Sequence, residues 1–307
     1  MSKTDRRTFM KAGLALGAAG LVEFRGLGRA AAAATGPDIV AVKGTDAFAS
    51  TVKALEALGG IKRFVSRGKR VGLLVNAPGI WRLEGSHTRT EVALATAKMC
   101  LDAGAREVMS LPTLATNFWQ RCALSQSHTS LIKSILECSD KFVERKIVKG
   151  ISLKTVMVRP ELLDVDVLIN IPIAKHHSGT NFTGNLKNMM GGLSHETNRF
   201  FHNGSPKGGH EDVDFLSQCI ADLSTLRRPD LCVVDATTVL GSNGPAGPGD
   251  LLRPQKVVAG TDPVAVDAYC VSLHSRRPDE VVMLAKAAAH GTGRADLSKL
   301  IVKEIAG

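Results

Sequence analysis

The stretch Val165–Pro172, VDVLINIP, has the pattern of a strand that is apolar on both faces, and a proline ends it. It leads into Ala174–Gly192, AKHHSGTNFTGNLKNMMGG, where two adjacent histidines, two lysines and several hydroxyl and amide side chains follow one another. Ligands in open parallel sheets collect beyond the carboxyl ends of the strands. The sequence therefore places a candidate site directly after this strand.

Apolar runs and helical spacings alternate along the rest of the chain. Further strands are expected at Ile39–Val42, Arg70–Asn76, Glu107–Leu111, Phe142–Val148, Thr155–Val158, Asp230–Asp235, Gln255–Ala259 and Leu300–Ile305, and helices at Asp46–Leu58, Thr88–Ala103, Glu211–Leu226, Asp262–Leu273 and Arg277–Ala289. This order is typical of parallel crossover units. We predict an α/β fold with an open, mainly parallel sheet and helices on both faces. A single domain is expected over residues 35–307, with two helices inserted at 113–138 and a further insertion at 193–210.

Two helix starts carry local signals. Asp262 followed by Pro263 joins a capping carboxylate to a proline at the first helical position, which fixes a helix start. Thr88 or Thr90 is expected to cap the helix that follows it.

Residues 1–34 resemble a twin-arginine export signal. Its features are Arg6–Arg7, then Phe9 and Lys11, a weakly apolar run at Ala12–Val22, and small residues for cleavage at Ala30–Ala34. The signal predicts a periplasmic or extracellular protein, with the twin-arginine translocase as its partner during export. Substrates of this route cross the membrane folded, often with a cofactor, which favours a bound metal or redox group. The alternative is an ordinary basic N-terminus on an amphipathic helix.

The charge of the chain favours anions as partners. The formal net charge is +10, of which residues 1–34 contribute +4, and the remaining basic residues are spread out. With one tyrosine and two tryptophans, the chain has few aromatic rings for stacking on bases. We therefore predict no nucleic-acid partner. No apolar run reaches the length of a membrane span, so no stable span is expected in the mature chain.

Six widely spaced cysteines form no C-x-x-C pair. No iron–sulfur cluster is therefore predicted. Most of these cysteines lie in apolar periodic segments, which favours buried free thiols, while one or two disulfides remain an alternative.

Histidines gather after the quoted strand. Five of the nine lie between residues 176 and 210, and acidic residues follow two of them. Imidazole and carboxylate ligands suit zinc or iron, so His176, His177 and His195 are candidate ligands of a divalent metal. The alternative for Glu196–His210 is an exposed loop rich in asparagine and glycine.

The same stretch also has the features of an anion cradle. Gly184–Met190 is expected to begin a helix, whose first amides favour negative charge. The candidate ligand-binding residues are Asn76, Lys175, Thr180, Thr183, Gly184, Asn185, Asn188 and Asp267. Lys187 would contact a ligand or form an ion pair with Asp235 or Asp267.

These segments together resemble the uncharacterised prokaryotic family known as domain of unknown function 362. The resemblance rests on Thr183, Gly184, Lys187, Asn188 and Gly191, on a second signature with Asp235, Gly244, Pro245, Asp262, Pro263 and Asp267, and on the crossover unit that begins at Gly68. It covers roughly residues 65–275. Many members are described as iron–sulfur proteins because a ferredoxin-like segment is attached to them. This chain lacks that segment and resembles an exported subtype.

Two classes of function remain open. The first is an exported enzyme, metal-assisted or redox-linked, with His176, His177, Lys187 and Asp235 around one pocket. The second is a non-catalytic periplasmic protein that binds a metal or a small anionic ligand. No nicotinamide fingerprint, serine nucleophile elbow or kinase signature is present, so the sequence names no reaction.

Overall fold

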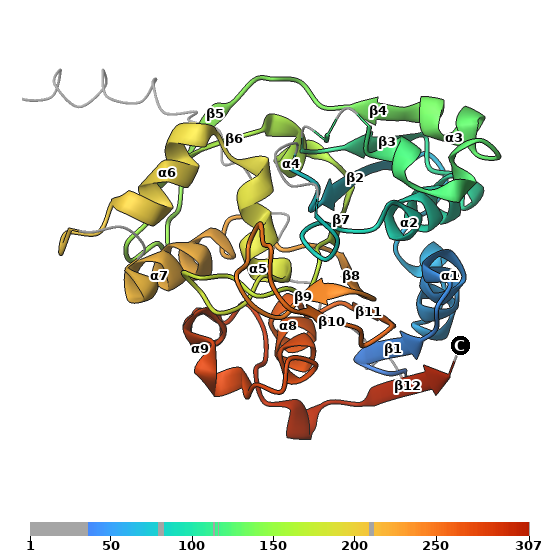
Figure 1. Ribbon diagram of the computed structural model, residues 1–307. Coiled ribbons are helices and arrows are strands. Elements are labelled where there is room, and N and C mark those ends of the chain that lie inside the picture. Colours follow the sequence, from blue (N-terminus) through green and yellow to red (C-terminus); the bar gives the residue numbers. More distant parts are fainter. Residues whose placement is uncertain (1–35, 79–82, 113, 116, 209–211, 307) are drawn as a thin grey trace, which may run out of the picture. The chain divides into compact units, whose positions relative to one another are not determined.

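The computed structural model describes residues 36–78, 83–112, 114, 115, 117–208 and 212–306. Its strands are β1 Ile39–Lys43, β2 Arg70–Val75, β3 Glu107–Ser110, β4 Ile135–Glu137, β5 Val143–Lys146, β6 Thr155–Val158, β7 Val167–Ile171, β8 Leu231–Ala236, β9 Val239–Leu240, β10 Leu251–Leu252, β11 Lys256–Gly260 and β12 Val302–Ala306. Eight of them form one sheet in the order β12-β1-β11-β8-β7-β2-β3-β4 (Figure 1). The predicted signal at residues 1–34 lies outside the described residues.

The sheet is mainly parallel, as the sequence predicted. β7 pairs with β2 and β8, β2 with β3, β3 with β4, and β1 with β12, all in parallel. β11 is the exception, because it runs antiparallel to both β1 and β8. The carboxyl ends of β2, β3, β7 and β8 therefore lie along one edge of the sheet.

Helices cover both faces of this sheet. They are α1 Ala47–Ala57, α2 Thr90–Asp102, α3 Thr129–Ser134, α4 Pro160–Asp164, α5 Asn185–Asn188, α6 His195–Asn203, α7 Val213–Leu223, α8 Pro263–Ser272 and α9 Val282–Ala289. Neighbouring strand residues enter different cores: Leu73 packs with α1 and α2, whereas Leu74 packs with α5, α7, α8 and α9. Because side chains alternate across a strand, these two cores lie on opposite faces.

The N-terminus of α8 was predictable from local sequence, whereas that of α2 was not. Asp262 accepts hydrogen bonds from the amides of Val264 and Ala265 at 3.0 and 3.1 Å, which confirms the predicted cap of α8. The predicted threonine cap of α2 is wrong, because the N-cap position is Arg89. Its backbone N–H donates to the carboxylate of Asp235 at 2.7 Å, which ties the start of α2 to β8.

The two predicted insertions differ from expectation. Residues 119–134 hold two short 3₁₀ turns and α3, and residues 135–137 then form β4, so the prediction of two helices there is wrong. The alternative of an exposed loop at Glu196–His210 is wrong for its first part, because His195–Asn203 form the helix α6, capped by the Ser194 hydroxyl, which accepts from Thr197 N. Phe201 is buried and anchors α6 to the core.

The cysteines follow the expectation of free thiols. All six are unpaired, and five of them are buried. Among the described residues, no helix is both long and apolar enough to cross a bilayer.

Candidate functional site

The chain that leaves β7 stays inside the protein for several more residues. Ile173 pairs with Asp235 at the end of β8, and Lys175 pairs with Thr183 across a tight return. Thr183 N donates to Lys175 O at 2.7 Å, and His176 N donates to Leu240 O at 2.8 Å. The stretch singled out by the sequence is therefore fixed by its backbone at the carboxyl edge of the sheet.

Lys175 points into the protein rather than toward solvent. Its ammonium donates to the backbone oxygens of Ser86 and Pro245, the latter at 2.8 Å, and the residue is fully buried. Burial lowers the pKa of Lys175 to about 6, with the Lys187 ammonium adding to the shift. Lys175 thus links three loops, which is a positioning role.

The two adjacent histidines have defined hydrogen-bond roles. His177 Nδ1 accepts from Gly179 N at 3.0 Å, and His176 Nδ1 accepts from Gly244 N at 3.1 Å. A neutral imidazole whose Nδ1 accepts carries its proton on Nε2. Burial, followed by the charge of Lys187, lowers the pKa of His177 to about 2, so its ring is neutral.

These roles do not suit the predicted metal site. A ligating imidazole offers one bare nitrogen to the metal and donates from the other, whereas here Nδ1 is occupied and Nε2 carries the proton. His195, the third predicted ligand, is exposed at the start of α6. Within the described ranges, no group of three or more His, Cys, Asp or Glu side chains is placed to hold a metal ion.

The predicted anion cradle at α5 is filled by the protein's own carboxylate. Asp267 accepts from the backbone amide of Asn185 at 2.6 Å, from its Nδ2 at 2.9 Å, and from Leu186 N at 3.0 Å. A Cβ at Gly184 would lie 2.3 Å from Asp267 Oδ1, so glycine is required for this approach. Burial raises the pKa of Asp267 to about 7. All described side-chain hydrogen bonds of Asp267 are made with this turn, and none with Lys187.

A chain of buried amides supports the same turn. Asn76 Nδ2 donates to Asn188 Oδ1 at 2.9 Å, and Asn188 Nδ2 donates to Asn170 Oδ1 at 2.7 Å. Asn170 Nδ2 then donates to Asn185 O at 2.8 Å. Asn170 lies in the middle of β7, which the sequence analysis treated as apolar, so this residue was missed. The carboxamides join β2, β7 and α5.

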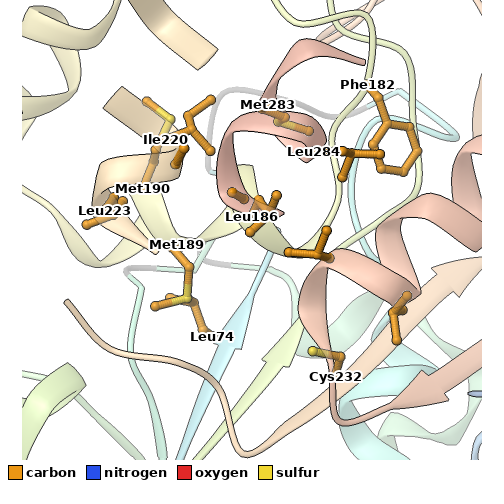
Figure 2. Packing of buried hydrophobic residues seen from close by; sticks show 14 of the residues in the cluster. Leu74, Phe182, Leu186, Met189, Met190, Ile220, Leu223, Cys232, Met283 and Leu284 are labelled. Atoms are coloured by element: carbon orange, nitrogen blue, oxygen red, sulfur yellow. The ribbon is translucent and has the colours of Figure 1, made fainter. Parts of the chain in front are cut away.

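In addition to the amide chain, hydrophobic packing holds α5 against the sheet. Leu186 and Met189 lie in the large core together with Leu74, and Figure 2 shows Met189 beside Leu74. Thr180 is buried, and its hydroxyl donates to Phe182 O at 2.9 Å. The oxygens Asn76 Oδ1, Asn185 Oδ1 and Thr183 Oγ1 are buried and have no hydrogen-bond partner among the described residues.

Asp235 is used in the same structural way. It is fully buried and accepts from Arg89 N at 2.7 Å, and also from the amide and hydroxyl of Thr237 at 2.9 and 2.7 Å. Burial raises its pKa. The predicted catalytic carboxylate therefore joins β8 to the first turn of α2.

A cavity of about 230 Å³ lies in front of that turn, at the carboxyl ends of the parallel strands. We call it the strand-end pocket; it is lined by Glu84, Gly85, His87, Arg89, Thr90, Glu91, Arg121 and Thr238. Arg89 Nη2 forms an ion pair with Glu91 Oε1 at 2.9 Å, and Glu84 Oε2 lies 3.8 Å from Arg253 Nη2. Arg121 Nε and Nη2 both donate hydrogen bonds to Asn117 Oδ1. Its buried Nη1 has no hydrogen-bond partner among the described residues.

Basic groups extend from this pocket into the predicted site. Burial, then the charges of Arg121 and Lys175, lower the pKa of His87 to about 4. The charge of Lys187 in turn lowers the pKa of both Lys175 and His177. The ring of His177 stacks on that of His202, with centroids 6.2 Å apart. The structure thus brings Lys175, His177 and Lys187 together, and Lys175 lies close enough to act on His87 in a pocket that sequence reasoning did not assign.

Arg121 and His87 were missed for different reasons. Arg121 lies in a segment expected to be a helical insertion, and a lone arginine there gave no signal. His87 follows the loop after the β2 segment, in SHTRT, and its position past a strand end was the signal available.

The chain resembles known proteins in sequence and in backbone. A family model described as Domain of unknown function (DUF362) matches residues 71–272. A thylakoid-associated protein of Synechocystis sp. is 25% identical over 245 residues, covering 78% of this chain and 73% of that protein. The lactate racemase apoprotein of Thermoanaerobacterium thermosaccharolyticum matches with a TM-score of 0.44 and 11% identity, over 72% of this chain and 54% of that one. A protein of Thermotoga maritima matches with a TM-score of 0.41 and 14% identity, over 76% and 60%. This chain therefore spans less than two thirds of either solved structure.

Proposed function

The chain belongs to the DUF362 family over residues 71–272, and on this premise we propose that it binds a small anionic ligand in the strand-end pocket. The observation that carries the proposal is Arg121, which lines the cavity and whose buried guanidinium nitrogen Nη1 lacks a partner among the described residues. A buried donor left without an acceptor costs about 1–3 kcal/mol. A carboxylate or phosphate oxygen would remove that cost, and guanidinium groups bind such oxygens well.

The buried polar atoms that lack a hydrogen-bond partner are of different kinds around α5 and in the strand-end pocket. Around α5 they include the amide oxygens of Asn76 and Asn185, which accept hydrogen bonds and would repel an anion. In the strand-end pocket the atom is a cationic donor. Because burial lowers the pKa of Lys175 to about 6, this lysine is mostly neutral at pH 7, and the guanidinium of Arg121 is what supports an anionic ligand over a metal ion.

A thermal-shift series with acetate, phosphate and sulfate tests this proposal. The fitting anion, at about a hundred times its Kd, is expected to raise the Tm by about 5–10 °C. Arg121→Gln should abolish the rise, because it removes the cationic donor. Arg277→Gln removes an equal charge at an exposed site and should leave the rise intact. An equal rise in Arg121→Gln, or none with any of these anions, would refute the pocket as the anion site.

A second candidate function is an enzyme that uses the same pocket. It is favoured by His87, which lines the cavity as a neutral imidazole because burial, then Arg121 and Lys175, keep its pKa near 4. A neutral ring near a bound anion can accept a proton from it. If the protein is an enzyme, His87→Gln should lower turnover of a bound carboxylate and leave its Kd within about threefold. If it is only a binder, no turnover will accompany binding.

We also propose export by the twin-arginine route, on the basis of Arg6–Arg7 and the residues after them. Replacing both arginines by lysine should retain the chain in the cytoplasm while the parent chain is exported. Cell fractionation followed by immunoblotting measures this, and equal export of both forms would contradict the proposal.

A further inference from the structure

The hairpin formed by β5 and β6 presents two apolar side chains to solvent on a tightly held loop. Val148 is 82% exposed and Ile151 is 63% exposed, and only two residues lie between them. Single exposed aliphatic residues are ordinary at protein surfaces, but two on one loop form a protrusion. Figure 1 shows β5 and β6 next to α6, well away from α1, β1 and β12.

The outward direction of these side chains is built into the loop. Ile147 and Leu153, which flank them, are buried in the core. The fully buried carboxylate of Asp222 accepts from the amides of Ile151, Ser152 and Leu153 at 2.9, 2.7 and 2.8 Å. Such a network fixes the loop before any partner arrives, so little ordering entropy is lost on binding.

Two further groups hold the loop from inside the protein. Gln218 Nε2 and His290 Nε2 each lie 2.8 Å from Asp222 Oδ1, so both oxygens of this carboxylate are engaged. A Cβ at Gly150 would lie 1.9 Å from Leu153 O, and only glycine permits the turn between the two apolar side chains. The loop is therefore a fixed feature of the fold.

Positive charge surrounds the same loop. The hairpin Val143–Val158 carries four exposed cationic side chains and one exposed carboxylate: Arg145, Lys146, Lys149 and Lys154 against Glu144. Lys149 lies between the two apolar residues in sequence, and the Lys154 ammonium donates to Gly150 O at 2.8 Å. Aliphatic side chains at the tip with cations behind them match a bilayer surface, which offers acyl chains beneath anionic headgroups.

We propose that this hairpin is a docking element for the surface of an anionic phospholipid bilayer. Val148 and Ile151 insert at the level of the headgroups and upper acyl chains, while the four cations contact lipid phosphates. The element binds peripherally and spans nothing. The proposal is independent of the strand-end pocket and of its ligand, because no residue of the hairpin lines that cavity.

Vesicle flotation of the full chain tests the docking. We expect binding to vesicles rich in phosphatidylglycerol, about tenfold weaker binding to pure phosphatidylcholine, and release at high salt. Val148→Ser together with Ile151→Ser should weaken binding by about tenfold or more. The matched control is Ile301→Ser, since Ile301 is 65% exposed elsewhere on the surface and should not matter.

A local probe keeps the test specific to the hairpin. Tryptophan fluorescence of Val148→Trp should be quenched by brominated phosphatidylglycerol, whereas that of Ile301→Trp should not be. The proposal is overturned if the double serine variant binds as the parent does, or if both tryptophans are quenched equally. It is also overturned if substitution of the lysines weakens vesicle binding and substitution of the apolar pair does not, because Val148 and Ile151 would then not insert.

Discussion

The segment Ala174–Asn188 and the wall of the strand-end pocket both follow parallel strands at one edge of the sheet. In the segment, most polar groups satisfy one another: Asp267 holds the turn at Asn185, and Lys175 holds the loops at Ser86 and Pro245. In the wall of the pocket, a guanidinium nitrogen of Arg121 is left over. A dense run of polar residues therefore marks structure as readily as a ligand site, and the distinguishing sign is a donor that the fold does not use.

The largest effect is expected from Asp267→Ala. The change leaves the amides of Asn185 and Leu186 without their acceptor inside the core, and should lower the free energy of unfolding by about 3–5 kcal/mol. Urea unfolding measures this loss. Asp279→Ala, at an exposed carboxylate, is the control and should change stability by less than about 0.5 kcal/mol. A loss for Asp267→Ala as small as that of the control would mean that the segment is not held from within.

An intermediate effect concerns pH and Lys175. Burial, then Lys187, lower the pKa of Lys175 to about 6, below the ordinary 10.5. Between these values the unfolded chain binds a proton that the folded protein does not. The free energy of unfolding should therefore rise with pH across this window, by at most about 1.4 kcal/mol per pH unit.

Lys175→Met should remove that part of the pH slope. Lys299→Met, at a lysine side chain that is 78% exposed, should retain it. Chemical denaturation at a series of pH values measures both slopes. An unchanged slope in Lys175→Met would show that its ammonium is not enclosed as described.

The smallest effect is expected from Thr183→Val. The buried Thr183 hydroxyl has no hydrogen-bond partner among the described residues, so replacing it by a methyl group should change stability by less than about 1 kcal/mol, toward higher stability. Anion affinity should be unchanged. Isothermal titration with the anion found in the thermal-shift series tests this, and a large loss of affinity would move the ligand site from the pocket to the segment.

Local chemistry made much of the fold predictable. Asp262 and Pro263 fixed a helix start, and the apolar runs located the strands of a mainly parallel sheet. The failures came where distant contacts override composition. Residues 135–137 become a strand because β3 offers an edge to pair with, and α6 forms because Ser194 caps it and Phe201 is buried.

The candidate site was predictable in place but not in its residues. Its position past the strand ends followed from the apolar runs. The direction of Lys175 could not be foreseen, because its acceptors, Ser86 and Pro245, lie 89 and 70 residues away in the chain. The two family signatures meet where Asp267 approaches Gly184, a contact that the sequence did not predict.

The pairing of β1 bears on when this protein can acquire its final form. Ile39, early in the chain, is matched with Gly260 on one side and Val302 on the other. The ribosome must therefore release almost the whole polypeptide before this strand gains either neighbour, and until then its backbone groups stay open to unwanted association. Closure of that sheet margin is a late, post-translational event, and a chaperone that shields the nascent N-terminal half would have its greatest benefit during this interval.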